Sequence, residues 1–202
     1  MNDKIKSFCI LLFLLFLVLS NTKAATVLPL PSDTAGKSKS DLWAYQSLNI
    51  VKQKIIPTRE IRVAVVDDGF RLSHKALKNY IYTNEKEVPG NFQDDDQNGY
   101  VDDADGDNNV ALPVRREEVF YHGTYIAGII TAIFEKCYGA EASKYLKIIP
   151  VKVLSDRATN TYLADGYKGI KYASDMGVDI ICCAWSGGSA SEEEKQIVQN
   201  AI

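Results

Sequence analysis

Two side chains that could transfer a proton together lie 55 positions apart (122 − 67) in the sequence. Asp67 follows the apolar run 61–66 and opens the tripeptide Asp67-Asp68-Gly69, whereas His122 stands at the start of a segment with helical periodicity. A general base requires a neutral imidazole that a carboxylate holds in one orientation. Taken alone, each residue has a simpler interpretation, because Asp is common in turns after strands and His can be a solvated cap residue. The pair is therefore a hypothesis that depends on its surroundings.

The apolar pattern predicts the elements that would position these two side chains. Continuous apolar runs rich in β-branched residues are typical of buried strands, and apolar residues at steps of three and four indicate helices. Strands are expected at 61–66, 146–154 and 178–185, and helices at about 126–137, 163–173 and from 189 onward. This alternation predicts an α/β fold, a parallel β-sheet with helices on both faces. Functional side chains gather at the carboxyl ends of such strands, and Asp67 lies at one of them.

A second group of candidate residues forms an acidic segment of twelve residues, 94–105. Oxygen-bearing side chains stand at positions 1, 3, 5, 9 and 12 of this segment, and Gly99 stands at position 6, as in an EF-hand-type calcium loop. The expected ligands are Asp94, Asp96, Asn98, Tyr100 through its backbone carbonyl, Asp102 and Asp105. Asp105 replaces the usual bidentate Glu, and its shorter side chain would weaken or reshape the site. The alternative is a solvated acidic loop without a metal.

The N-terminus has the composition of a targeting segment. Lys4 and Lys6 precede twelve unbroken apolar residues, 8–19, and small residues at Thr22 and Ala24 flank a cleavage point. This pattern predicts a signal peptide at 1–24 and a secreted or periplasmic protein with no membrane contact after cleavage. An uncleaved membrane anchor is the alternative, although twelve residues are too few to span a bilayer comfortably. A polar linker is expected at 25–41, and the folded domain at 42–202.

The net charge and the cysteines limit the partners and the metal sites that we expect for this chain. The formal net charge of −3 gives no basic surface, so nucleic acid is excluded as an expected partner, and we expect a monomer. Removal of the signal peptide leaves Cys137, Cys182 and Cys183. An odd number with an adjacent pair favours buried free thiols over a disulfide framework, and neither histidine has the spacing to these cysteines that zinc ligands usually show.

Two motifs resemble those of the subtilisin-like serine proteases. Residues 63–69, Val-Ala-Val-Val-Asp-Asp-Gly, resemble the family's catalytic-Asp motif, with Asp68 in place of the usual Ser or Thr, as in the kexin and furin branch. Residues 122–128, His-Gly-Thr-Tyr-Ile-Ala-Gly, resemble the His motif, with Tyr125 replacing a second His. The order Asp then His agrees with that of subtilisin. The resemblance, which covers about 42–202, implies that Asp67 and His122 are catalytic.

The same resemblance implies a polypeptide substrate. Residues 180–187 are similar to the family segment whose backbone pairs with an extended substrate, which implies that Ala184, Trp185 and Ser186 bind substrate. Ala184 and Ser186 depart from the usual Ser and Gly, and a side chain in the place of Gly would narrow the pocket. Many bacterial relatives carry a similar acidic insertion between the two motifs, here at about 83–118, which implies a structural calcium ion.

The resemblance implies a serine endopeptidase that cleaves peptide bonds with an Asp-His-Ser triad. Neither the nucleophilic serine nor the oxyanion asparagine is recognisable in these 202 residues. We therefore expect the N-terminal part of a peptidase domain that is inactive by itself. The alternative is a non-catalytic secreted relative that acts as a calcium-stabilised peptide-binding module. A third interpretation is an unrelated parallel α/β domain with chance motifs and an acidic loop for metal-dependent adhesion.

Overall fold

A computed structural model describes residues 45–48, 50, 56–104, 121–155, 158–159, 162–163 and 165–202. The chain divides into two compact units, Met1–Ile50 and Val51–Ile202, and the elements named below belong to the second. The predicted signal peptide and linker lie outside the described residues, and so does Asp105. Among the residues that are described, no helix is both long and apolar enough to cross a membrane.

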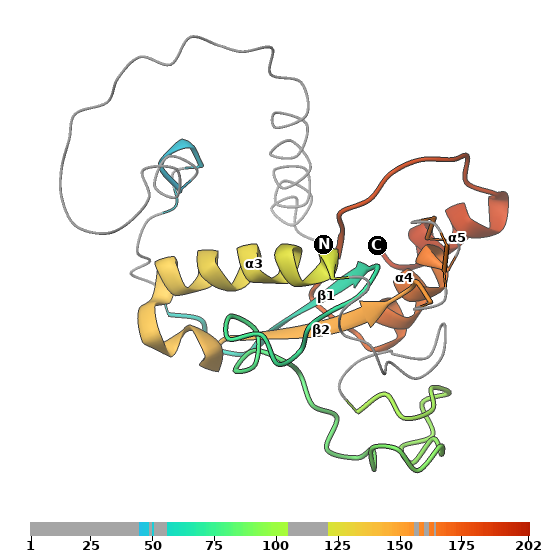
Figure 1. The fold of residues 1–202 in the computed structure, drawn as a ribbon, viewed down its shortest axis with the longest axis horizontal. Helices are drawn as coiled ribbons and strands as arrows, with labels where there is room; N and C mark the ends of the chain where they lie inside the picture. The colour runs from blue at the N-terminus through green and yellow to red at the C-terminus, as the bar shows by residue number, and fades with distance from the viewer. Residues whose placement is uncertain are drawn as a thin grey trace, which may run out of the picture. The chain divides into compact units, whose positions relative to one another are not determined.

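Three parallel strands form the centre of the second unit (Figure 1). They are β1 (Ile61–Asp67), β2 (Leu146–Lys152) and β3 (Ile180–Cys183), in the spatial order β2-β1-β3. The register pairs Ile61 with Leu146 on one side of β1 and Val63 with Ile180 on the other. The expected parallel sheet is thus confirmed, and β1 with its Asp67 lies at its centre.

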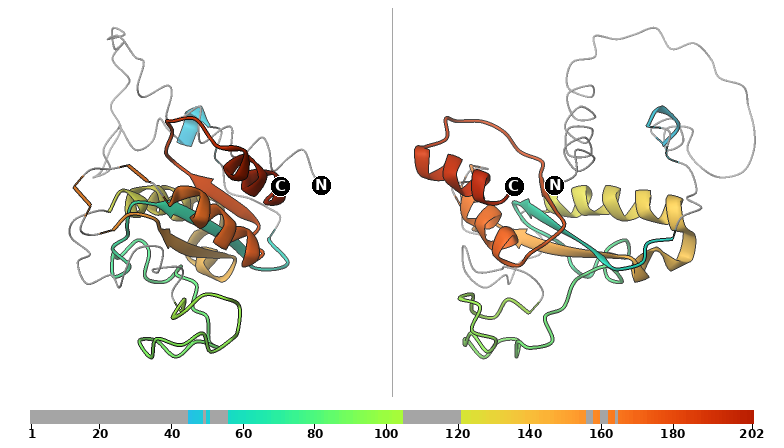
Figure 2. Two further views of the ribbon diagram at one scale, coloured as in Figure 1. Left: turned by 90° about the vertical axis from the view of Figure 1, so that its right-hand side faces the viewer. Right: turned by 180° about the vertical axis from the view of Figure 1, so that it is seen from behind.

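Helices cover both faces of this sheet, as the apolar pattern predicts (Figure 2). The helices are α3 (His122–Tyr138), η1 (Gly139–Lys144), α4 (Gly166–Asp175) and α5 (Glu192–Asn200). Because successive strand residues point to opposite faces, Val63 and Val65 pack with the α3 side while Ala64 and Val66 pack with the α4 side. Both faces of β1 are therefore buried from Val63 to Val66, which explains the continuous apolar sequence of these four residues.

Two glycines allow the helices to approach the strands closely. A Cβ atom on Gly169 of α4 would lie 2.6 Å from Val153 and 2.7 Å from Val66. A Cβ atom on Gly123, the second residue of α3, would lie 2.5 Å from the Phe70 ring and 2.8 Å from the carbonyl oxygen of Gly69. The start of α3 is thereby held against the turn that follows β1.

The acidic segment is attached to α4 through side chains. The hydroxyl of Tyr172 donates to Asp103 at 2.9 Å, and the hydroxyl of Tyr100 donates to Asp175 at 2.7 Å. The Tyr100 and Tyr172 rings meet edge to face with centroids 4.6 Å apart. These contacts hold the segment against the helix that packs on the Val66 face of the sheet.

Candidate active site

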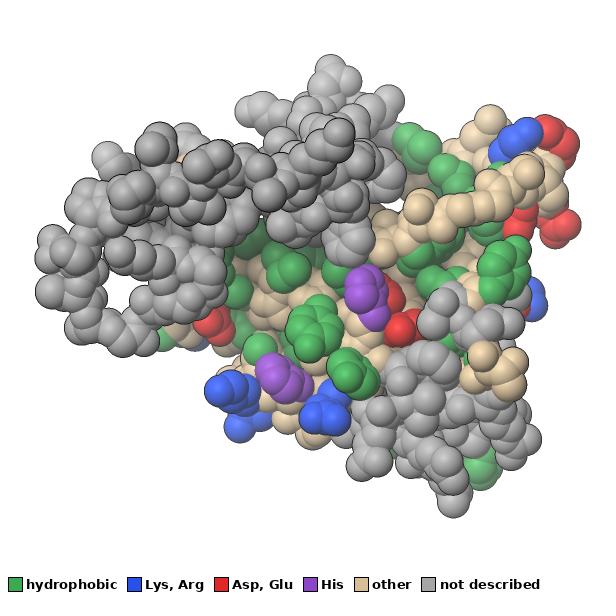
Figure 3. All heavy atoms as spheres, turned by 45° about the horizontal axis from the view of Figure 1, so that its top comes forward, with side chains coloured by type: hydrophobic (Ala, Val, Ile, Leu, Met, Phe, Trp, Pro, Cys, Tyr) green, Lys and Arg blue, Asp and Glu red, His purple; other side chains and the backbone are tan. Residues whose placement is uncertain are grey.

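Asp67 and His122 meet where the end of β1 faces the start of α3. His122 Nδ1 lies 2.9 Å from Oδ1 and 3.1 Å from Oδ2 of Asp67. The Asp67 side chain is 2% exposed, whereas that of His122 is 41% exposed. On the face drawn in Figure 3, one of the two histidines lies against acidic side chains at the surface. The structure thus brings together the two residues that the sequence predicts as catalytic.

The immediate neighbours of Asp67 hold its carboxylate in place. The backbone amide of Asp68 donates to Asp67 Oδ1 at 2.8 Å. The Asp68 carboxylate in turn accepts from the backbone amide of Gly123 at 3.3 Å. The strand end and the helix start are therefore joined both through the side-chain pair and through the adjacent residues.

Burial dominates the electrostatics of the carboxylate. Loss of hydration raises the pKa of Asp67 to about 6, and the nearby charge of Asp68 also raises it. Hydrogen bonds from the Asp68 amide and from His122 act in the opposite direction. Since an ionised carboxylate only accepts hydrogen bonds, Nδ1 of His122 carries the proton and Nε2 is left as the acceptor. The pair has the arrangement of a general base held by a buried carboxylate.

The predicted substrate-binding residues follow β3 directly, and one of them has its side chain engaged elsewhere. The indole N–H of Trp185 donates to the carbonyl oxygen of Val66 at 2.9 Å, and the ring meets Tyr167 edge-on with centroids 5.9 Å apart. The ring also occupies the space next to Gly166, where a Cβ atom would come within 2.9 Å of it. Ala184 is half-buried and Ser186 is exposed. Of these three residues, Trp185 is thus the one whose side chain packs against the start of α4.

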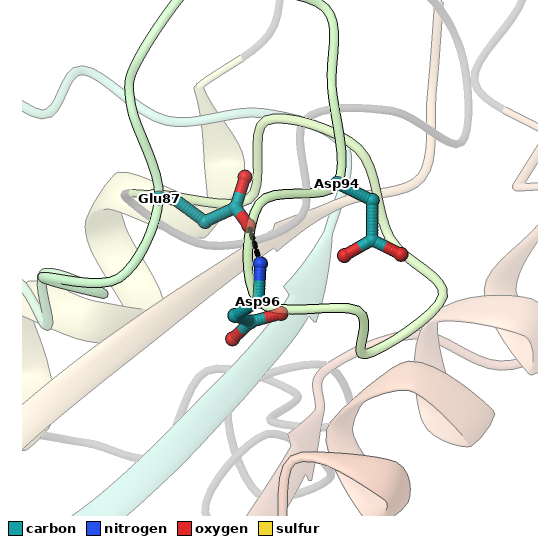
Figure 4. A group of neighbouring side chains, drawn as sticks. All are labelled: Glu87, Asp94 and Asp96. Carbon is teal, nitrogen blue, oxygen red and sulfur yellow. Dashed lines mark hydrogen bonds between the residues drawn. The ribbon is translucent and has the colours of Figure 1, made fainter.

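The acidic segment brings two predicted ligands together with one that sequence reasoning missed. One ligand oxygen from each of Glu87, Asp94 and Asp96 lies within 4.8 Å of the others (Figure 4). Glu87 is 5% exposed, and its Oε1 accepts from the backbone amides of Asp95 and Asp96 at 2.9 and 3.1 Å. Its Oε2 is buried and has no hydrogen-bond partner among the described residues. Glu87 precedes the twelve-residue pattern, so no spacing rule would have indicated it.

The other predicted ligands are placed differently. Asn98 contributes its backbone amide to Asp94 and Asp96, while its side-chain amide donates to Asp103 at 3.1 Å. The Asp102 carboxylate accepts from three successive backbone amides, at Gly90, Asn91 and Phe92, with distances of 2.7 to 3.2 Å. Asp102 therefore holds the turn at 90–92.

Asp103, the neighbour of Asp102, is fully buried and stands at the centre of a polar network. Its carboxylate accepts from the side chains of Asn84, Asn98 and Tyr172. The network links the acidic segment to α4 independently of any metal. The sequence template does not use this position, which lies between two of its ligands.

Comparison with known proteins identifies a family that matches this chain. The family model described as "Subtilase family" matches residues 58–202. The chain is 31% identical over 183 residues to "Major intracellular serine protease" of Bacillus subtilis (strain 168), covering 91% of this chain and 49% of that protein. It is 30% identical over 155 residues to "Subtilisin-like protease 1" of Plasmodium berghei (strain Anka), covering 74% of this chain and 25% of that protein. "Fervidolysin" of Fervidobacterium pennivorans is 25% identical over 179 residues, with 84% and 23% covered. The chain thus spans half or less of the length of these relatives.

Proposed function

Because the chain belongs to the subtilase family, we propose that it contributes the carboxylate and the imidazole of a serine endopeptidase active site. The family supports serine-type peptidase activity in general. The observation that carries the specific assignment is the contact of 2.9 Å between His122 Nδ1 and Asp67 Oδ1 at the carboxyl end of a central parallel strand. The family match also excludes an unrelated α/β domain with chance motifs.

The proposed roles follow from the geometry of the pair. Asp67 keeps the proton on Nδ1, so that Nε2 of His122 is the base that accepts the hydroxyl proton of the attacking serine. The imidazolium formed in this step is stabilised by the buried negative charge at 2.9 Å. His122 then returns the proton to the leaving amine, and water completes hydrolysis of the acyl-enzyme in a second cycle.

We assign neither the nucleophilic serine nor the oxyanion asparagine to a residue of this chain. Ser191 is the N-cap of α5, where its hydroxyl accepts from the backbone amide of Glu194 at 3.2 Å. Ser186 and Ser189 lie in the segment between β3 and α5, beside the proposed substrate-binding residues. We therefore propose none of these three serines as the nucleophile.

The proposed substrate is a polypeptide. β3 is an edge strand of the described sheet, and the backbone that continues from it at Ala184 and Ser186 is suited to pairing with an extended peptide. The Trp185 side chain supports this backbone from the α4 side through its bond to Val66. Nothing in the net charge of −3 favours nucleic acid as a further partner, and a monomer is proposed.

Calcium is the proposed metal, and the residues of the acidic segment fit it. Glu87, Asp94 and Asp96 present hard oxygen ligands within 4.8 Å of one another, and the buried Oε2 of Glu87 lacks a partner among the described residues. A divalent cation would compensate that buried charge and the repulsion among the carboxylates. Asn98 and the Tyr100 carbonyl are the further proposed ligands. The role is structural, since calcium would hold the loop that packs on α4.

Export is proposed from the signal peptide predicted at 1–24. That segment lies outside the described residues, so the proposal depends on its sequence pattern. Family membership by itself does not decide the compartment, since the printed name of the Bacillus relative calls that protein intracellular. N-terminal sequencing of the protein recovered from the culture medium or periplasm would test it, with a new N-terminus at Ala25 as the expected result.

The central test is covalent labelling by a serine-directed phosphonate. The gene product translated through any codons that follow Ile202 is treated with the probe, and the 202-residue chain is treated in parallel. We expect labelling of the longer product that is abolished by His122→Ala, and none of the 202-residue chain. Peptide hydrolysis by the 202-residue chain that His122→Ala abolishes would overturn the statement that its serines are not the nucleophile. A folded longer product that resists labelling but retains peptides would favour the peptide-binding module.

A further inference from the structure

Asp68, the residue directly after β1, makes polar contacts with three separate elements. Its backbone amide donates to Asp67 Oδ1 at 2.8 Å, and its carboxylate accepts from the backbone amide of Gly123 at 3.3 Å. Its backbone carbonyl accepts from Lys152 Nζ at 2.9 Å. The first contact is with Asp67 itself, the second is with the residue after His122, and the third is with Lys152, the register partner of Asp67 on β2. Asp68 thus joins the surroundings of the proposed pair.

The contact with Gly123 gives a backbone amide at the start of α3 a hydrogen-bond acceptor. The first amides of a helix have no acceptor within the helix, and a side chain at the N-cap usually supplies one. In α3 the N-cap residue is Tyr121, which makes no side-chain cap, and the first turn contains no acidic residue. The carboxylate of Asp68 supplies both the acceptor and the negative charge from a neighbouring element.

The Asp68 carboxylate contacts the residue that directly follows His122, so the cap acts on the turn that carries the imidazole. The charged residues near the start of α3 are Asp67 and Asp68 at the end of β1, the buried Lys152 on β2, and Arg71, whose backbone amide donates to Thr124 Oγ1 at 2.8 Å. In η1, which also packs on α3, Glu141 and Lys144 form an exposed ion pair at the other end of the helix. The Lys152 ammonium is bound to the Asp68 carbonyl, so the Asp68 carboxylate faces the helix start.

We propose that Asp68 is a positioning residue for the Asp67–His122 pair: its carboxylate caps α3 from outside the helix. The cap fixes the first turn of α3 and hence the direction from which the imidazole meets Asp67. This role rests on the proposed function for its catalytic meaning, but the two contacts can be measured without any proteolysis.

Three substitutions separate the cap from the charge. Asp68→Asn and Asp68→Ser keep an oxygen that can accept from Gly123 but remove the charge, whereas Asp68→Ala removes both. The readouts on the 202-residue chain are the NMR signal of the His122 Nδ1 proton, which reports the contact with Asp67, and the exchange rate of the Gly123 amide proton. The sequence holds only two histidines, so His74→Gln leaves a single imidazole signal to follow.

We expect the His122 Nδ1 proton signal to shift or broaden in Asp68→Ala, because loss of the cap loosens the turn that holds the imidazole against Asp67, and to change little in Asp68→Asn. We expect exchange of the Gly123 amide to accelerate about tenfold in Asp68→Ala and to change little in Asp68→Asn. If Asp68→Ala fails to fold, Asp68→Ser still tests the cap, because its shorter side chain should lengthen the contact and accelerate Gly123 exchange. Unchanged Gly123 exchange or an unchanged His122 Nδ1 signal in folded Asp68→Ala would overturn the proposal, and so would unchanged Gly123 exchange in folded Asp68→Ser if Asp68→Ala does not fold.

The outcome is distinguishable from failure of the proposed function. If both readouts change as expected while the longer gene product never reacts with a serine-directed phosphonate, the contacts of Asp68 are confirmed and the peptidase assignment is wrong. If the longer product is an active peptidase and neither readout changes, the peptidase assignment is confirmed and the proposed role of Asp68 is wrong. In an active product, Asp68→Ala should lower kcat/KM, and Asp68→Asn, which keeps the acceptor for Gly123, should restore most of it.

Discussion

The indole N–H of Trp185 donates to the carbonyl oxygen of Val66 at 2.9 Å, one residue before Asp67. This bond joins the segment after β3 to the end of the central strand, and the ring packs on Gly166 and Tyr167 at the start of α4. A residue that sequence similarity alone assigns to substrate binding therefore also supports the strand end that presents the buried carboxylate. Four predictions concern this region and the acidic segment.

Trp185→Phe should lower the free energy of unfolding by about 1 to 3 kcal/mol, because it removes the donor to Val66 and part of the ring's packing. Chemical denaturation of the purified chain measures this change. Tyr125→Phe is the matched control, since the Tyr125 side chain is 65% exposed and should change the stability little. Equal stability of Trp185→Phe and the unmodified chain would show that the indole bond contributes nothing.

Gly169→Ala should lower the free energy of unfolding by about 1 to 3 kcal/mol, because the added methyl group overlaps Val66 and Val153. The control is Gly128→Ala in α3, where a Cβ atom would meet no atom within 4 Å. That control should raise stability by about 0.5 to 1 kcal/mol, since Ala favours a helix interior over Gly. Thermal unfolding of the two variants measures both effects, and a loss of stability of the same size in both would contradict the packing argument.

The stability of the chain should fall as pH rises from about 4 to 6. Burial raises the pKa of Asp67 from an ordinary value of 3.8 to about 6, so the folded state binds this proton more tightly than the unfolded state does. The corresponding stabilisation is complete below the unfolded pKa and is lost as pH passes the folded pKa. The effect is on the order of 2 to 3 kcal/mol. Asp67→Asn should lack this loss, and melting temperatures of both proteins between pH 3.5 and 8 measure it. If the melting temperatures of the two proteins decline in the same way as pH rises, groups other than Asp67 cause the pH dependence.

Millimolar calcium should raise the melting temperature of the chain, because a ligand that binds only the folded state stabilises it. Glu87→Gln should abolish most of this shift, since it removes the charge of a carboxylate whose Oε2 is buried without a partner among the described residues. Glu60→Gln, at an exposed position, is the control and should keep the full shift. Calorimetric titration supplies an independent measure of binding. Equal shifts in the melting temperatures of Glu87→Gln and the control would show that Glu87 is not a calcium ligand. The absence of any shift in the unmodified chain would show that the chain does not bind calcium.

The helix and strand pattern was largely predictable, because buried parallel strands require nearly continuous apolar sequence and covering helices require an apolar stripe. Asp67 could be placed at a strand end and His122 at a helix start on this basis alone. The acidic segment was predictable only in part. Asp94 and Asp96 follow the spacing of a calcium loop, but Glu87 reaches them from outside that pattern, and Asp102 binds the turn at 90–92 instead.

By itself, the sequence determined the family, the order of the elements and the types of residue available for chemistry. These depend on local periodicity and on motifs within a few residues of one another. Only the tertiary structure decided that Asp67 and His122, 55 residues apart, meet at 2.9 Å, that Asp68 accepts from Gly123, and that the Trp185 ring turns toward α4. The physical reason is that such contacts depend on how β1, α3 and β3 pack in space, which local spacing along the chain does not specify.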